Sequence, residues 1–228
     1  MKKFWIILAV IAAVAVVLVG GFIFMVMPKA PDLKAYQHLT SPEIVKMERQ
    51  KMLCVELTGD PSKTSMRAIP ALFKTYFSLK GVDRSKAAAP RARWTADLKI
   101  PADQWVGNFG LPVPEEVIEL PEQKGDLKLE LKYWEYGEVA QILHIGAYSD
   151  EAPTVDLLQI FAKERGYKLV GLHEEEYLKG PGMFFKGDSK QYQTVIRYRL
   201  EKLKVVKKAP AKIVKAPAKK KTKTKTKK

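Results

Sequence analysis

Short segments rich in apolar residues, bounded by glycine or proline, follow one another through the middle of the chain. Side chains of a half-buried strand point alternately to the two faces of a sheet, so such segments are typical of β-structure. We therefore predict strands over residues 52–58, 91–98, 116–120, 127–136, 138–145, 168–177 and 192–200.

Helices are predicted over residues 62–79 and 153–165. Proline lacks a backbone N–H, so Pro70 should be tolerated only in the first turn of the first helix. Pro153 suits the first position of the second helix, and Gly166 suits its C-terminal cap. An apolar stripe at helical spacing marks the buried face of the second helix, formed by Val155, Leu158 and Ala162.

The order strand, helix, strand, strand occurs twice. A turn glycine precedes a terminal glycine by 22 residues in the first unit (Gly59 to Gly81) and by 20 residues in the second (Gly146 to Gly166). This spacing indicates duplication of a β-α-β-β unit. The predicted fold class is α+β, with two helices on one face of a largely antiparallel sheet. A ligand has room on the other face or in a cleft between the halves.

Residues 4–27, after a short segment 1–3, form an uncharged run of 24 residues. As a helix the run would be ~36 Å long, enough to span a hydrocarbon core of ~30 Å. The apolar region of a cleaved signal peptide is usually ~7–15 residues long and ends at small residues. This run is longer and ends in FIFMVM, so its length favours a transmembrane helix that contacts the lipid bilayer.

The remaining chain divides by composition into a proline-containing linker over 28–43, a domain over 44–202 and a lysine-rich tail over 203–228. Thirteen of the 40 Lys and Arg residues lie in 202–228, which contains no acidic residue. The other residues carry 27 basic against 25 acidic groups, so the net charge of +15 belongs mainly to the tail. Such a tail cannot bury enough apolar surface to fold and should be disordered.

Charges near the apolar run bear on orientation. Lys2 and Lys3 precede it, and Lys29 and Lys34, offset by Asp32, follow it. This small bias favours a single-pass protein of the inner membrane with the domain exported, and the opposite topology stays open. For an exported domain, the lysine tail would bind anionic lipid or another polyanion in preference to DNA; specific DNA recognition is not expected.

Three consecutive glutamates, 174–176, carry the main candidate chemistry. If this segment is extended, His173, Glu175 and Tyr177 share one face and the other two glutamates point the opposite way. A buried Glu175 could bind a cationic ligand or act as general base on a water molecule. The alternative is an acidic edge exposed to solvent.

Aromatic residues offer walls for such a pocket, or ordinary packing in the sheet: Tyr133, Trp94, Trp105 and Trp134. His144 and His173 lack a third histidine or a cysteine pair beside them, so we predict no metal site. Neither a glycine-rich phosphate loop nor a G-x-S-x-G motif occurs, and no cofactor is expected.

Three stretches of the chain resemble the GyrI-like small-molecule-binding family, which is related to the effector-binding domains of AraC-type regulators. They are GDPSKTS at 59–65, AQILHIGAYSDEAPT at 140–154, and GYKL at 166–169 followed by HEEEYL at 173–178. The resemblance spans residues 44–202 and is closest to stand-alone members. It departs from them in the missing double-tryptophan segment and in Gly180–Pro181, where the family has Asp-Pro.

The resemblance implies two β-α-β-β units with a ligand cleft between them. It implies ligand-binding roles for Glu175, Tyr177 and Tyr148, to which the residue pattern adds Trp94 and Trp134. Some stand-alone relatives bind hydrophobic cations, and others add water to strained cyclopropane-type electrophiles. In the second case Glu175 and Tyr177 would be catalytic, so the resemblance leaves both a binding module and a hydrolase open.

Overall fold

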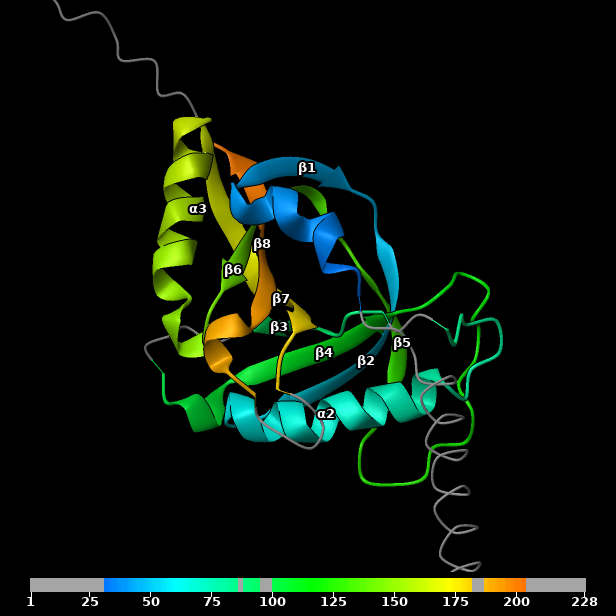
Figure 1. Cartoon of the computed structure of the whole chain (residues 1–228). Coiled ribbons are helices and arrows are strands. Elements are labelled where there is room, and N and C mark those ends of the chain that lie inside the picture. Colours follow the sequence, from blue (N-terminus) through cyan, green and yellow to red (C-terminus); the bar gives the residue numbers. More distant parts are fainter. Residues whose placement is uncertain (1–30, 86–87, 95–99, 182–186, 204–228) are drawn as a thin grey trace, which may run out of the picture.

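The computed structural model describes residues 31–85, 88–94, 100–181 and 187–203. These residues form an α+β fold with eight antiparallel strands in one sheet (Figure 1). The strands are β1 (Glu43–Met47), β2 (Gln50–Thr58), β3 (Arg91–Trp94), β4 (Val106–Pro112), β5 (Glu130–Trp134), β6 (Gly137–Ile145), β7 (Tyr167–Lys179) and β8 (Gln193–Lys202). The helices are α2 (Pro61–Tyr76) and α3 (Ala152–Glu164), with 3-10 turns η1 (Leu33–Thr40), η2 (Ala102–Gln104), η3 (Tyr148–Asp150) and η4 (Ser189–Gln191).

The sheet consists of two similar halves. The chain runs β2-α2-β3-β4 and then β6-α3-β7-β8, and the strands lie in the order β1-β6-β8-β7-β3-β4-β2-β5. The six strands of the two units are therefore symmetric about the pair β7–β3. The β-α-β-β order predicted from the glycine spacing thus occurs twice, and the two units meet at the centre of the sheet.

Both helices pack on the same face of the sheet, which we call the helix face. Leu72 of α2 packs with Leu53 and Phe109, and Leu158 of α3 packs with Ile196. Cross-strand partners share a face, so the pairs Ala92–Phe109, Ala92–Glu175 and Glu175–Ile196 carry this face across the seam. The side chain of Glu175 therefore lies on the helix face.

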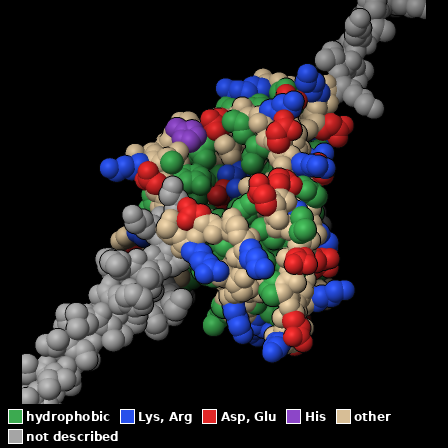
Figure 2. Space-filling model, turned by 90° about the vertical axis from the view of Figure 1, so that its right-hand side faces the viewer, with side chains coloured by type: hydrophobic (Ala, Val, Ile, Leu, Met, Phe, Trp, Pro, Cys, Tyr) green, Lys and Arg blue, Asp and Glu red, His purple; other side chains and the backbone are tan. Residues whose placement is uncertain are grey.

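The other face, which we call the inner face, lies inside a curl of the sheet. Strands β1 and β2 stand near opposite ends of the strand order, yet Glu48 and Arg49 alone connect them. Side chains from both ends meet there in one buried cluster, formed by Met52, Cys54, Trp134, Tyr136 and Val139. Seen from the side, the surface is hollowed near its centre, and acidic and basic side chains lie in the hollow beside apolar ones (Figure 2).

Helix α2 differs from the prediction at its N-terminus and at Pro70. Asp60 is its N-cap, and the carboxylate accepts hydrogen bonds from the backbone N–H groups of Ser62 and Lys63. Pro70 lies inside the helix, so the expectation that it must fall in the first turn was wrong. Pro70 has no backbone N–H to donate to the carbonyl of Met66. Both residues face solvent, where water can hydrate that carbonyl.

Several predicted boundaries also differ from the structure. Residues 116–120 form no strand, and β4 was not predicted because its sequence VGNFGLP contains two glycines and a proline. Residues 33–40, expected to be linker, form η1, which packs on the inner face with Leu39 only 1% exposed. The domain therefore includes η1 and β1.

The predicted transmembrane run 4–27 and almost all of the tail 203–228 lie outside the described residues. Within the described part of the chain, none of the helices has the length and apolar character needed to span a bilayer.

Candidate functional site

The central strands β3 and β7 bring the glutamate segment opposite two arginines. Arg91 pairs with Glu176, Ala92 with Glu175, and Arg93 with Glu174. Strand alternation sends both arginines and their glutamate partners to the inner face. Opposite Glu175 stands the small Ala92, so the segment Arg-Ala-Arg provides no cation for Glu175 on the helix face.

On the helix face, Glu175 accepts hydrogen bonds from three neighbours. The Nε2 atom of His173 lies 2.9 Å from Glu175 Oε1, the Tyr177 hydroxyl donates to Glu175 Oε2, and the Trp94 indole N–H also donates to the carboxylate. The Glu175 side chain is 12% exposed. These contacts confirm the predicted common face of His173, Glu175 and Tyr177.

A second carboxylate, Glu151, belongs to the same cluster and was not predicted from the sequence. It lies between η3 and α3, and its Oε2 atom is 3.4 Å from His173 Nε2. Its Oε1 atom is buried and has no hydrogen-bond partner among the described residues. The Nδ1 atom of His173 lies 2.7 Å from the Tyr198 hydroxyl, which fixes the orientation of the ring.

The three titratable groups have strongly altered pKa values. Burial raises the pKa of Glu151 to about 7, although the hydrogen bond from His173 opposes this shift. For His173, burial lowers the pKa, but hydrogen bonds to Glu151 and Glu175 outweigh it and raise the pKa to about 11. For Glu175, burial raises the pKa, but the hydrogen bond and charge of His173 prevail and lower it. These directions favour a His173–Glu175 ion pair at neutral pH, beside a Glu151 carboxyl whose pKa is raised.

Tyrosines line the cluster. The Tyr148 ring lies edge-on to the Tyr177 ring at 5.6 Å and also packs against Tyr192 at 5.4 Å. On the opposite side, Trp94 packs against Trp105 at 6.1 Å. Four of the five predicted ligand-binding residues, Glu175, Tyr177, Tyr148 and Trp94, thus lie around one carboxylate. Trp134 lies on the inner face, where the Arg93 guanidinium stacks 4.2 Å from its ring centre.

Glu151, His173 and Glu175 each present a potential metal ligand, and these atoms all lie within 4.8 Å of one another. The two carboxylates that raise the pKa of His173 would also attract a metal ion, which binds the imidazole only after the proton has left. The arrangement fits a group that carries positive charge, whether an imidazolium or a bound cation. His144 is separate from this cluster and contacts Thr154 and the carbonyl of Ala147.

Glu175 does not line either of two cavities found along the described residues. One, of about 430 Å³, lies at the surface loop 120–128. The other, of about 280 Å³, lies on the inner face beside Arg93 and Arg197. Segments 95–99 and 182–186, which follow β3 and β7 in sequence, are outside the described residues.

No protein-family model matches the sequence, and no curated protein does. Solved structures do resemble the chain. An uncharacterized conserved protein from Listeria innocua matches with a TM-score of 0.61 and 22% identity, over 75% of this chain and 97% of that one. A hydrolase from the same organism matches with a TM-score of 0.61 and 21% identity, over 75% and 96%.

The C-terminal domain of EcmrR is a more distant match, with a TM-score of 0.50 and 14% identity, over 72% of this chain and 98% of that domain. EcmrR bound to DNA also matches, with a TM-score of 0.51. At these identities the likeness shows a common fold. That fold agrees with the arrangement of two β-α-β-β units predicted from the sequence.

Proposed function

We propose that the domain binds a hydrophobic small molecule, cationic or electrophilic, beside Glu175. The observation that carries the proposal is the charge balance of the helix-face cluster. Two buried carboxylates, Glu151 and Glu175, share the single imidazole of His173, and one oxygen of Glu151 has no partner among the described residues. A cation that enters the cluster would compensate the second carboxylate.

The aromatic residues suit the same kind of ligand. Tyr148, Tyr177 and Trp94 present ring faces and edges next to the carboxylates. A cation over an aromatic ring gains about 0.5–2 kcal/mol, more when it is desolvated. Positive charge would also favour the ionised form of Glu151, so affinity for the cation should increase as the pH rises through about 7.

A matched pair of probes tests the proposal. Tetraphenylphosphonium and tetraphenylborate have nearly the same shape and opposite charges, so their ratio of affinities isolates the electrostatic part of binding. The full-length chain in non-ionic detergent should prefer the phosphonium. Glu175→Gln should weaken phosphonium binding about tenfold, as expected for a charge-assisted contact.

Glu164→Gln removes the same charge from an exposed position at the end of α3 and serves as the control. Its affinity for phosphonium should equal that of the unaltered chain. Equal affinity in Glu175→Gln would remove Glu175 from the binding site.

A hydrolase is the second candidate, favoured by the Tyr177 hydroxyl that donates to Glu175. Glu175 would take a proton from water while the oxygen attacks a cyclopropane carbon. The strained C–C bond breaks, and its electron pair moves to a conjugated carbonyl that is then protonated. The lowered pKa of Glu175 keeps it ionised but makes it a weak base, which is why we place binding first. Recovery of a cyclopropane probe with the mass of one added water, absent with Glu175→Gln, would favour the hydrolase.

The proposal also places the domain at a membrane. Residues 4–27 would anchor it to the inner membrane with the domain exported, and the lysines of 203–228 would contact anionic lipid. Deletion of 4–27 should release the protein from alkali-washed membranes. Retention of the shortened chain would refute the anchor and leave the binding site untouched.

A further inference from the structure

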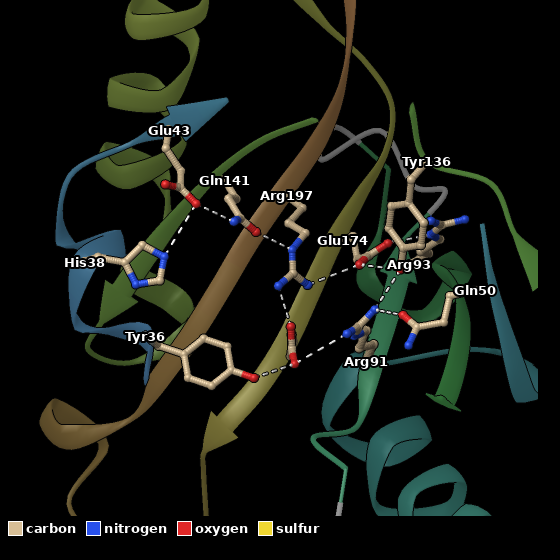
Figure 3. Close-up of polar contacts among 11 residues, drawn as sticks. Tyr36, His38, Glu43, Gln50, Arg91, Arg93, Tyr136, Gln141, Glu174 and Arg197 are labelled. Carbon is tan, nitrogen blue, oxygen red and sulfur yellow. Dashed lines mark hydrogen bonds and ion pairs between the residues drawn. The ribbon is translucent and has the colours of Figure 1, made fainter. Parts of the chain in front are cut away.

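The inner face of the same strands carries a second, differently charged cluster. Arg91, Arg93 and Arg197 gather there with Glu174 and Glu176 (Figure 3). Arg197 Nη2 lies 2.5 Å from Glu176 Oε2, and Arg93 Nε lies 2.7 Å from Glu174 Oε2. Three guanidinium groups therefore face two carboxylates, which leaves one positive charge in excess.

Neutral groups contact several other hydrogen-bonding atoms of this cluster. Tyr136 accepts from Arg91 Nη1 at 2.9 Å and donates to Glu174 Oε1 at 3.0 Å. The Gln141 side chain accepts from Arg197 Nε at 2.7 Å. Glu43 reaches the cluster through Gln141, with no direct contact to a guanidinium, and also faces His38. The excess positive charge thus lacks a directly contacting carboxylate within the described residues.

A cavity of about 280 Å³ opens beside this excess charge. Arg93 and Arg197 lie along it, and so does Arg199, two residues farther along the same face of β8. Arg199 is exposed, and its side chain makes no ion pair or hydrogen bond within the described part of the chain. Of the two acids along the cavity, Glu174 is shared between Arg93 and Arg197, and Glu135 is exposed at the rim.

The cavity walls also contain apolar and aromatic surface. The Arg93 guanidinium lies 4.2 Å from the centre of the Trp134 ring and 4.7 Å from the centre of the Tyr136 ring. The residues along the cavity include Tyr136, Leu172, Val139, Tyr133 and Tyr198. Gly171 stands at a bulge of β7 with φ of 80°, a conformation that glycine adopts freely, and brings the backbone of β7 to the cavity.

From this geometry we infer that the inner-face cavity binds a small organic anion, a carboxylate or phosphate monoester with one ring or a short apolar chain. Its anionic group contacts Arg199 and Arg93, and its apolar part lies against Leu172. Guanidinium groups pair well with carboxylate and phosphate oxygens. An unpaired buried charge is costly, and the anion compensates the excess positive charge. This site is independent of the proposed cation site on the helix face.

Phenyl phosphate and benzoate are suitable probes, with benzylamine as a cation of similar size. Titration of the full-length chain in non-ionic detergent should give saturable binding of one anion and none of benzylamine. Arg199→Gln, at an exposed position that the fold tolerates, should weaken anion binding roughly tenfold or more. Arg165→Gln removes the same charge from the end of α3 and should leave binding unchanged.

The lysines of the tail are the competing explanation, and deletion of 204–228 separates the two. Binding that survives the deletion and falls in Arg199→Gln establishes the inner-face site. Binding that disappears with the tail, affinity equal in Arg199→Gln and Arg165→Gln, or an absence of saturable binding would each overturn the inference. None of these results changes the expected binding of tetraphenylphosphonium, so this site and the cation site can fail separately.

Discussion

The two faces of β7 carry the same residue type in opposite electrostatic surroundings. On the helix face, Glu175 and Glu151 share one histidine. On the inner face, Glu174 and Glu176 meet three arginines, Arg91, Arg93 and Arg197. Adjacent glutamates differ because strand side chains alternate and because β3 places Arg, Ala and Arg opposite them. One face is short of positive charge and the other has an excess.

The charge difference between the faces helps to distinguish groups that bind a ligand from groups that stabilise the fold. Each inner-face glutamate contacts two guanidinium groups, so removal of Arg197 takes one charged partner from both buried carboxylates at once. The helix-face carboxylates hold a proton and an imidazolium, both of which an incoming cation can replace. On both faces, groups that a ligand can displace or compensate belong to a binding site, whereas the ion pairs between strands hold the sheet together.

The largest effect should come from Arg197→Met. Arg197 contacts Glu174, Glu176 and Gln141, so its loss leaves two buried carboxylates short of their partner. Breaking a buried ion pair on one side costs about 3–5 kcal/mol. Denaturant unfolding should show this loss, while exposed Arg199→Gln should change the free energy of unfolding by less than about 0.5 kcal/mol. A loss below about 1 kcal/mol in Arg197→Met would contradict the assigned role of the inner face.

Substitution of two glycines of β4, one on each face, compares the packing of the two faces directly. A Cβ at Gly107 would lie 2.6 Å from the Trp94 ring and 2.8 Å from Phe109, on the helix face. A Cβ at Gly110 would lie 3.1 Å from Met52 and from Trp134, on the inner face. Overpacking costs about 1–3 kcal/mol, so Gly107→Ala should be the more destabilising change.

Gly107→Ala should also displace Trp94 from Glu175, which tryptophan fluorescence would detect. The two variants can be ranked by denaturant unfolding. Equal losses, or a larger loss in Gly110→Ala, would show that Trp94 is not held tightly beside the cluster.

Glu151 on the helix face and Glu176 on the inner face should change the stability in opposite directions as the pH rises. The pKa of Glu151 is raised to about 7 from about 4.5, so its contribution is present below about 4.5 and is lost as the pH rises to about 7. As the pH rises from 4.5 to 7, the free energy of unfolding of Glu151→Gln should therefore increase by about 1–3 kcal/mol relative to that of the unaltered chain. Urea unfolding across this range measures the change.

Glu176 is the matched case on the inner face. Burial opposes ionisation, but Arg197 and Arg91 lower the pKa of Glu176, so its contribution is present above about 4.5 and is lost as the pH falls. Relative to the unaltered chain, Glu176→Gln should have the largest loss in free energy of unfolding at neutral pH and the smallest in acid. If both variants followed the same trend with pH, the contrast between the faces would be wrong.

The smallest effect concerns Tyr198, whose hydroxyl contacts His173 Nδ1. Tyr198→Phe removes one hydrogen bond and should cost about 0.5–1.5 kcal/mol. It should weaken phosphonium binding by less than Glu175→Gln does, because the carboxylate stays in place. Calorimetric titration of both variants would rank them, and the reverse order would show that His173 orientation matters more than the Glu175 charge.

Much of the fold followed from local sequence signals. Glycine spacing predicted the duplicated units, and strand alternation placed His173, Glu175 and Tyr177 together. Strand β4 escaped because glycines at 107 and 110 lower strand propensity, although they are needed where Trp94 and Trp134 approach the backbone. Helix α2 contains Pro70 because that position faces solvent, which the sequence alone does not specify.

The residues that meet across the sheet could be identified only from the strand register, which the sequence alone does not give. Trp134 and Trp94 are each the last residue of a strand, but the register places them on opposite faces of the sheet. Glu151 stands inside the quoted motif AQILHIGAYSDEAPT, yet nothing local shows that it meets His173, which lies 22 residues farther along the chain. The spacing Arg-x-Arg at 91–93 and Glu-x-Glu at 174–176 was the available signal for the inner-face pairs.

One crossed titration tests the account most directly: Glu175→Gln and Arg199→Gln, each titrated with tetraphenylphosphonium and with phenyl phosphate. The account predicts that Glu175→Gln weakens binding of the phosphonium alone and that Arg199→Gln weakens binding of the phosphate alone. Equal losses of both probes in one variant, or unchanged affinities in both, would contradict two sites of opposite charge on the two faces of β7.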